Sequence, residues 1–194
     1  MANGSAQITG TMLQLTNGGQ TEAGSGWYPE KVGVAKFGTS FDFQLPTSAA
    51  DGFTFTLQND GGGYLALGGN GSAYGYQGIG NSVAVAFGFY ESGVTDAESV
   101  GVYTGGASPH SASLNMIGSG LNLHSGDIFH AQIAYSNGTM TVTLTDKNTG
   151  ATGSVNFSVD VVGAVGGSNA YAGFTGSTGA LTSTQNILNW TYTN

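Results

Sequence analysis

The sequence predicts an all-β domain, built as a sandwich or barrel of short antiparallel strands. Hydrophobic and polar residues alternate over several short segments, which is the period of a half-buried strand. Glycine is over-used, with 35 copies in 194 residues, and it concentrates in turns between those segments. No segment of helical length keeps a 3.6-residue period. The length fits one domain, residues 1–194, with a sizeable core.

Four segments show the alternation most clearly, and they are residues 41–45, 53–57, 140–145 and 188–192. In the second of these, Phe53, Phe55 and Leu57 share one face of the strand. Thr54 and Thr56 share the other face, where β-branched threonine suits an exposed pleat. Turns are expected between strands at three positions, Asn137-Gly138, Asn148-Thr149-Gly150 and Gly166-Gly167.

Residues 83–90 differ from the other strands because both of their faces are apolar or small. This pattern predicts a central strand that is covered on each side. The glycine-rich stretch before it, residues 61–80, contains Asn70, Tyr74 and Tyr76 and is too poor in aliphatic residues for a strand. It is therefore expected to be a loop, and a loop of this length in a compact domain is usually functional or disordered.

The low charge content limits the kinds of partner that the chain can bind. Only 7% of residues are charged, against about 25% in an average soluble protein, so the polar surface consists of hydroxyl and amide side chains. Such a surface suits hydroxyl-rich ligands, although an extracellular protein that simply avoids charge would look the same. Net charge is −8, and the cations are Lys31, Lys36 and Lys147. Without a basic patch, nucleic acid and anionic membrane surfaces are poor partners.

Localisation is inferred from composition. The chain has no cysteine, so disulfides do not fix its redox compartment, and no apolar run approaches the ~20 residues of a membrane-spanning helix. Residues 1–5 lack the features of a signal peptide and are expected to derive from an expression vector or to be disordered. We expect a secreted or cell-surface protein; a homo-oligomer stays open.

Three segments, in order, resemble the L-type (legume-type) lectin family. Residues 50–55, Ala-Asp-Gly-Phe-Thr-Phe, are similar to the family's Ala-Asp-Gly followed by an apolar strand. Residues 81–90 are similar to its Val-Ala-Val-Glu-Phe-Asp-x-Tyr/Phe strand. Residues 173–179 are similar to its Gly-Phe-Ser-Ala-x-x-Gly, and a Trp-containing strand follows at 188–192. The glycine-rich middle looks closest to bacterial members. The resemblance implies a concanavalin A-like jelly-roll sandwich with two antiparallel sheets.

The resemblance also implies a shallow sugar site made by four loops. Asp51 would accept hydrogen bonds from two sugar hydroxyls, and a charged acceptor makes about twice the bond of a neutral one. In the family, the Ala-Asp peptide is cis; the alternative for Asp51 is an ordinary Asp-Gly turn. Tyr74 and Tyr76 would stack on a sugar ring or pack locally. The remaining candidates are Gly71 (with Gly69 and Asn70), Ser92 or Glu91 in place of the family's loop Asn, and Gly179, Ala180 and Leu181 with Thr178 and Thr182.

The chain departs from the family at its metal site. The family's central strand carries Glu and Asp two residues apart, which bind a transition metal and calcium; here these positions are Ala86 and Gly88. A transition metal is therefore not expected. Weak calcium stays open, because Glu91, Asp96 and Glu98 follow the strand and hard oxygen ligands in loops bind Ca²⁺. The alternative is that these three acids are solvated.

The motifs of an enzyme are missing. Glycoside hydrolysis needs two carboxyl groups roughly 5–10 Å apart, and no strand carries such a pair. Glu22 and Glu30 lack partners, and His110, His124 and His130 do not form a metal-ligating pair, with His130 expected to be solvated on a strand. The sequence thus predicts non-catalytic binding of a glycan or polysaccharide. The alternative is a structural or adhesive sandwich that has lost the sugar and metal site.

Overall fold

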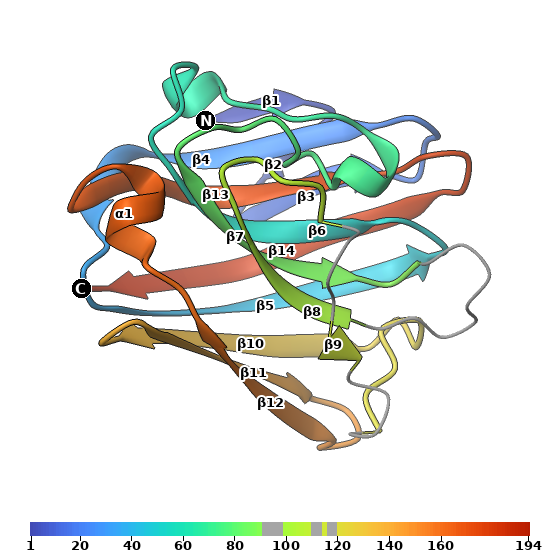
Figure 1. Ribbon diagram of the computed structural model, residues 1–194. Coiled ribbons are helices and arrows are strands. Elements are labelled where there is room, and N and C mark those ends of the chain that lie inside the picture. The colour runs from blue at the N-terminus through green and yellow to red at the C-terminus, as the bar shows by residue number, and fades with distance from the viewer. Residues whose placement is uncertain (91–98, 110–113, 116–119) are drawn as a thin grey trace.

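The computed structural model describes residues 1–90, 99–109, 114–115 and 120–194. Two antiparallel sheets form a sandwich, which confirms the predicted class (Figure 1). The first sheet has the order β1 (Ala2–Gly4), β4 (Ala23–Gly33), β13 (Asn169–Ser177), β6 (Gly52–Gln58), β7 (Ser82–Gly88), β8 (Ser99–Thr104) and β9 (Leu114–Asn115). The second has the order β12 (Thr152–Ser158), β11 (Thr139–Asp146), β10 (Ile128–Ser136), β5 (Phe37–Ser48), β14 (Ser183–Thr193), β3 (Met12–Asn17) and β2 (Gln7–Thr9).

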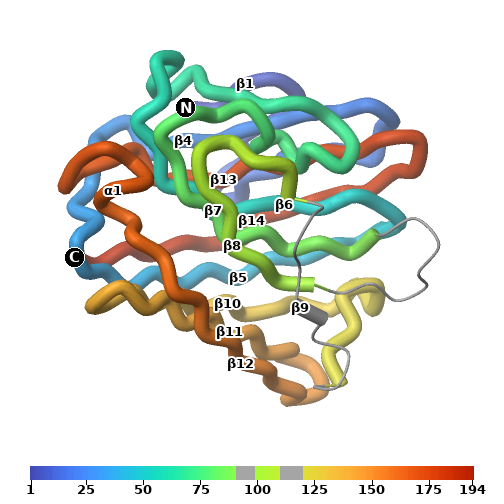
Figure 2. Tube along the Cα trace, in the orientation of Figure 1, coloured from blue at the N-terminus to red at the C-terminus, as the bar shows by residue number. Residues whose placement is uncertain are grey.

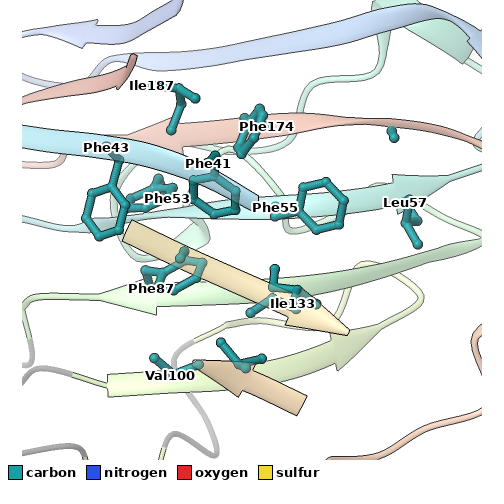
Figure 3. Close-up of a cluster of buried hydrophobic side chains, with 14 of the residues drawn as sticks. Phe41, Phe43, Phe53, Phe55, Leu57, Phe87, Val100, Ile133, Phe174 and Ile187 are labelled. Atoms are coloured by element: carbon teal, nitrogen blue, oxygen red, sulfur yellow. The ribbon is translucent and has the colours of Figure 1, made fainter. Parts of the chain in front are cut away.

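Aromatic rings fill the space between the sheets. Phe41 and Phe43 of β5 face Phe53 of β6 and Phe87 of β7, and Phe174 of β13 joins them (Figure 3). The Phe53 and Phe87 rings stack with centroids 4.9 Å apart, and the Phe41 and Phe174 rings meet edge to face at the same separation. Phe41, Phe43 and Phe53 belong to the apolar set of the alternating segments, so the period of the sequence correctly identified the buried face of those strands.

Helical structure is minor. The one α-helix in the described part of the chain, α1 (Val161–Val165), joins β12 to β13. The Asp160 side chain caps it by accepting a hydrogen bond from the Gly163 N–H, and Gly166 ends it with φ of 72°. Gly166-Gly167 is thus the end of a helix rather than the predicted strand-to-strand turn. No described helix has the length and apolar character needed to cross a membrane.

Residues 1–5 depart from the expectation of disorder. Strand β1 pairs in register with β4 at the edge of the first sheet, with Ala2 opposite Gly26 and Gly4 opposite Gly24. The Ser5 hydroxyl donates to the Leu15 carbonyl at 2.7 Å. The segment therefore contributes a strand, and its short length hid the pairing from any periodicity argument.

The stretch 61–80 runs over the outer face of the first sheet, as the chain trace makes clear (Figure 2). It contains two 3₁₀ turns, η1 (Gly63–Leu65) and η2 (Gly71–Ala73), and otherwise the predicted loop. Its buried members Tyr74, Tyr76 and Ile79 form a second apolar cluster with Ala84 and Ala86 of β7. This cover gives β7 two buried faces, as the sequence predicted.

The same cover overturns the expected exposure of Thr54 and Thr56. Both threonines are fully buried, and their hydroxyl oxygens lie 2.6 Å apart. The Thr175 hydroxyl lies 2.8 Å from that of Thr54 and donates to the Tyr74 carbonyl. The alternation of the strand is real, but the loop that follows β6 folds back over its polar face, and the hydroxyls satisfy one another there.

Candidate functional site

Three of the predicted site residues converge at one end of the sandwich. Asp51 immediately precedes β6, Gly71 begins η2, and Gly179 follows β13. A Cβ built on Gly179 would lie 3.1 Å from Asp51 Oδ2 and 3.4 Å from the Cα of Gly71. The Ala50–Asp51 peptide is cis, which the family resemblance implied.

Backbone hydrogen bonds fix the Asp51 segment to its neighbours. The Asp51 N–H donates to the Ser177 carbonyl at 3.3 Å, and the Asp51 carbonyl accepts from the Phe89 N–H at 3.2 Å. Asp51 thus lies between β13 and the end of β7, and only 6% of its surface is exposed. Both bonds are made by the main chain, so the buried carboxylate is carried by a fixed backbone, which preorganises it as an acceptor.

The Gly71 segment is tied to the loop after β13. The Gly71 N–H donates to the Thr178 carbonyl at 3.0 Å, and the Ser177 hydroxyl donates to the Gly71 carbonyl at 2.6 Å. Gly71 has a φ of 61°, a conformation that favours glycine. Ser177 and Thr178 are fully buried, whereas Ala180 and Leu181 beyond them are exposed, Leu181 by 45%. The loop therefore presents two apolar side chains and main-chain groups at the surface.

A further segment, the turn between β3 and β4, supports the candidate site and was not predicted from the sequence. The Thr21 N–H donates to the Gly179 carbonyl at 2.9 Å, and the Gln20 side-chain amide donates to the Ala180 carbonyl at 2.6 Å. Glu22 does have partners: its carboxylate accepts from the Gly19 N–H at 3.0 Å and the Asn17 N–H at 3.1 Å. This turn braces the loop 178–181 from behind. Nothing in the local sequence marks it as more than a Gly-rich turn.

Tyr74 and Tyr76 are not sugar-stacking residues. Their exposed fractions are 3% and 0%, and both rings belong to the cluster under the 61–80 stretch. Local packing, the alternative reading of these tyrosines, is correct. Tyr90 is a better stacking candidate, because it follows β7 next to the Asp51-bonded Phe89 and is 36% exposed. Its position at the end of the central strand was the signal available in the sequence.

The predicted loop after β7 lies outside the described residues. Glu91 and Ser92, the expected substitutes for the family's loop Asn, fall there, as do Asp96 and Glu98 of the expected calcium site. Within the described part of the chain, no group of three or more His, Cys, Asp or Glu side chains is placed to hold a metal ion. Ala86 and Gly88 carry no ligand atoms, so the residues present do not fit the strand-borne metal site of the family.

A polar cluster on the second sheet involves His130, which was expected to be solvated. Its Nδ1 lies 2.6 Å from Asp42 Oδ1, while the Lys147 ammonium and the Asn189 amide each donate to Asp42 Oδ2 at 2.9 Å. Burial raises the pKa of the Asp42 carboxyl, but the hydrogen bonds from Asn189, Lys147 and His130 and the Lys147 charge outweigh it and lower the pKa to about 2. Because its bonding capacity is largely satisfied internally, the cluster stabilises the sheet rather than offering a site.

An apolar pocket between the two sheets is separate from Asp51. It has a volume of about 260 Å³ and opens between the sheets beside β2, β3, β4 and β14, with Ile8, Met12, Tyr28 and Trp190 in its lining. Asp51, Gly71 and Gly179 do not line it. The convergent polar groups of the candidate site are thus not part of this apolar pocket.

The whole chain, residues 1–194, matches the family model of the legume lectin domain. Among solved structures, it is similar to lectin II from Ulex europaeus (22% identity, 100% of this chain and 91% of that one, TM-score 0.82). It is also similar to lectin I-B4 from Griffonia simplicifolia in a metal-free form (24%, 100% and 92%, 0.81). A third similar chain is arcelin-5, a lectin-like defence protein from Phaseolus vulgaris (21%, 99% and 90%, 0.80).

These likenesses extend over nearly the full length of the solved chains, so the sandwich is the lectin fold. The family binds carbohydrate without transforming it, in agreement with the predicted absence of catalysis. From the match along its entire length, the chain belongs to the legume lectin family.

Proposed function

We propose that this domain binds a glycan at the surface where Asp51, Gly71 and the loop 178–181 meet. The convergence of Asp51 with Gly179 and Gly71, from three separate loops, is the observation that carries the proposal. Two vicinal sugar hydroxyls donate to the Asp51 carboxylate, and the Gly179 and Ala180 main chain approaches the ring closely because residue 179 has no side chain. Each bond to a charged acceptor contributes about 1.5–3 kcal/mol.

Apolar contact completes the proposed site. Leu181 and Tyr90, exposed at 45% and 36%, belong to the chain segments that contact Asp51 through Gly179 and Phe89. Sugar rings have an apolar face of C–H groups, and aromatic or aliphatic side chains pack against it. Ser92, two positions after Tyr90 in the sequence and outside the described residues, is proposed to add a hydroxyl in place of the family's Asn.

An immobilised glycan panel tests this function. The panel includes galactose and N-acetylgalactosamine, because similar lectin structures were solved with these sugars. The wild-type domain is expected to bind to some of the immobilised glycans. Asp51→Ala is expected to lose that binding while keeping its melting temperature. Retention that is equal for both proteins would place the site elsewhere.

Calcium is proposed to be dispensable for this binding, since the strand positions 86 and 88 offer no ligand atoms. A loop site at Glu91, Asp96 and Glu98 would raise the affinity for glycan only modestly, because a site with only a few charged ligands binds Ca²⁺ weakly. Running the same panel in EDTA and in calcium chloride distinguishes a modest change from an absolute requirement.

A structural or adhesive domain is the second candidate. The observation that favours it is the replacement of both strand carboxylates by Ala86 and Gly88, the positions that support the sugar loops in the family. A panel on which the folded wild-type domain shows no retention, with and without calcium, would favour this candidate.

The setting of the domain is also a proposal. The charge-poor surface, 7% of residues, supports a secreted or cell-surface protein, and the glycine-rich stretch 61–80 supports kinship with bacterial lectins. Self-association is proposed through the outer edges of the sheets at β2 and β12, where strand pairing ends. Light scattering after size exclusion gives the oligomeric state directly.

A further inference from the structure

The outer face of the first sheet beside Asp51 is made of residues with little or no side chain. Gly52 of β6 pairs with Gly88 of β7, and the next outward pair is Thr54 with Ala86. All four are buried. Small residues on an outer face leave space above the sheet. Because these residues are buried, side chains from another segment must fill that space and exclude water.

The Tyr74 ring fills this room. A Cβ built on Gly88 would lie 2.6 Å from Tyr74 Oη, and one built on Gly52 would lie 2.5 Å from Tyr74 Cε2. The ring therefore lies across both glycines, in the space that side chains at positions 52 and 88 would otherwise occupy. Tyr74 is 3% exposed, so this position is a buried one.

Tyr74 is joined through its backbone to the proposed sugar loops. Its N–H donates to the Gly71 carbonyl at 3.1 Å, and its carbonyl accepts from the Thr175 hydroxyl at 2.7 Å. The same Gly71 carbonyl accepts from Ser177, and the Gly71 N–H donates to Thr178. A displacement of Tyr74 would thus be transmitted to Gly71 and to the loop 178–181 within one or two hydrogen bonds.

The family's strand carboxylates cannot coexist with this arrangement. An Asp at position 88 would place its Cβ inside the contact distance of the Tyr74 hydroxyl. Ala86, the other position, packs in the same cluster as Tyr74 and Tyr76. The ring and the metal ligands therefore exclude each other at this place on β7.

We propose that Tyr74 is a positioning residue that takes the place of the family's strand-bound ions, holding the Asp51 and Gly71 segments in their binding arrangement by packing and hydrogen bonds. The inference rests on the proposed sugar site for its functional part. Its structural part, the mutual exclusion of the Tyr74 hydroxyl and a side chain at position 88, is independent of any sugar.

A double-mutant cycle tests the structural part. Gly88→Ala is expected to lower the melting temperature by about 5 °C in the wild-type background, because its Cβ meets the Tyr74 hydroxyl. In the Tyr74→Phe background the hydroxyl contact is gone and the nearest ring atom is at 3.4 Å, whereas the Ser99 hydroxyl oxygen still lies 2.8 Å from the built Cβ. The loss is therefore expected to become smaller without disappearing. An equal loss in both backgrounds would overturn the placement of Tyr74.

Gly101→Ala on β8 is the matched control. Its Cβ would lie 2.8 Å from the Tyr103 ring, and Tyr74 is not among its nearest neighbours. Its effect on the melting temperature is expected to be the same in the wild-type and Tyr74→Phe backgrounds. A change in that effect would show that Tyr74→Phe loosens the whole face, which would contradict a local role for the hydroxyl at Gly88.

The functional part is tested with metal alone and with the glycan panel. EDTA, and calcium or manganese chloride, are expected to leave the wild-type melting temperature unchanged. On the panel, Tyr74→Ala is expected to lose at least tenfold in retention, Tyr74→Phe to restore it, and Tyr76→Phe, altered in the same cluster, to retain the glycan fully.

The outcomes separate this inference from the proposed function. A melting temperature that falls in EDTA and recovers in calcium would overturn the replacement of ions by Tyr74. So would full retention of glycan by a folded Tyr74→Ala. If the wild-type domain retains no glycan, the proposed function fails, while the Gly88 cycle and the EDTA melts still decide whether Tyr74 has displaced the metal site.

Discussion

Gly179 packs against the carboxylate of Asp51: a Cβ at residue 179 would lie 3.1 Å from Asp51 Oδ2. Such a contact is tight, so a methyl group there pushes the carboxylate or the loop by a few tenths of an ångström. Gly179→Ala is expected to weaken glycan retention about tenfold, which corresponds to about 1.4 kcal/mol, through a misplaced acceptor.

Gly61→Ala is the control for that substitution. Position 61 has nothing within 4 Å of its built Cβ, so the same chemical change is made in open space. Retention and melting temperature are expected to match the wild type. If Gly179→Ala also matches the wild type in retention, the loop 178–181 does not lie at the ligand.

The pH dependence of stability is expected to follow Asp42. Its pKa falls from 3.8 to about 2 on folding, so the folded state favours the ionised form. The stabilisation is complete above the unfolded pKa, and it is lost as the pH falls from about 4 to about 2. Each pKa unit is worth about 1.4 kcal/mol; with solvent screening of the partly exposed partners, the total is about 1–2 kcal/mol.

Urea unfolding at a series of pH values measures this contribution. The difference in unfolding free energy between the wild type and Asp42→Asn is expected to shrink as the pH falls through that window. A difference that stays constant from neutral pH down to pH about 2 would show that the cluster with His130, Lys147 and Asn189 does not stabilise the charge of Asp42.

Tyr76→Phe is expected to lower the free energy of unfolding of the domain. Burial raises the pKa of the Tyr76 phenol, which is therefore neutral, and its oxygen accepts from the Gly106 N–H at 3.1 Å and lies 2.9 Å from the Ser82 hydroxyl. Its removal leaves buried polar groups with fewer partners and costs about 1–3 kcal/mol. Tyr64→Phe, at an exposed ring, is expected to change stability by less than about 0.5 kcal/mol in the same chemical denaturation.

The strands and their buried faces were predictable because each depends on neighbours in the chain. Phe41, Phe43 and Leu45 face the core as their alternation indicated, and Asn137-Gly138 makes the hairpin between β10 and β11 with both residues at positive φ. Asp51 and Gly179 could be placed in one site only through the family resemblance, since 128 positions of chain separate them.

The errors came from contacts between distant segments. Thr54 has the sequence context of an exposed strand residue, but the 61–80 stretch covers it. His130 does lie on a strand with its side chain 34% exposed, and only its contact with Asp42 was not predicted. Likewise, no local pattern distinguishes a tyrosine that stacks on sugar from one such as Tyr74 that fills a space left by glycines. The path of the 61–80 loop decides the first and last of these cases and the pairing of β5 with β10 decides the contact of His130, and periodicity contains neither.

The most direct test of a metal-independent sugar site at Asp51 compares two proteins on the glycan panel in excess EDTA. The quantity compared is the retention of the wild-type domain and of Asp51→Asn. Asn keeps the size of the side chain and removes its charge, so the comparison isolates the acceptor. The wild type is expected to retain on the panel without metal, and the variant to lose at least tenfold in retention at an unchanged melting temperature. Loss of wild-type retention in EDTA, or equal retention of the two proteins, would contradict this.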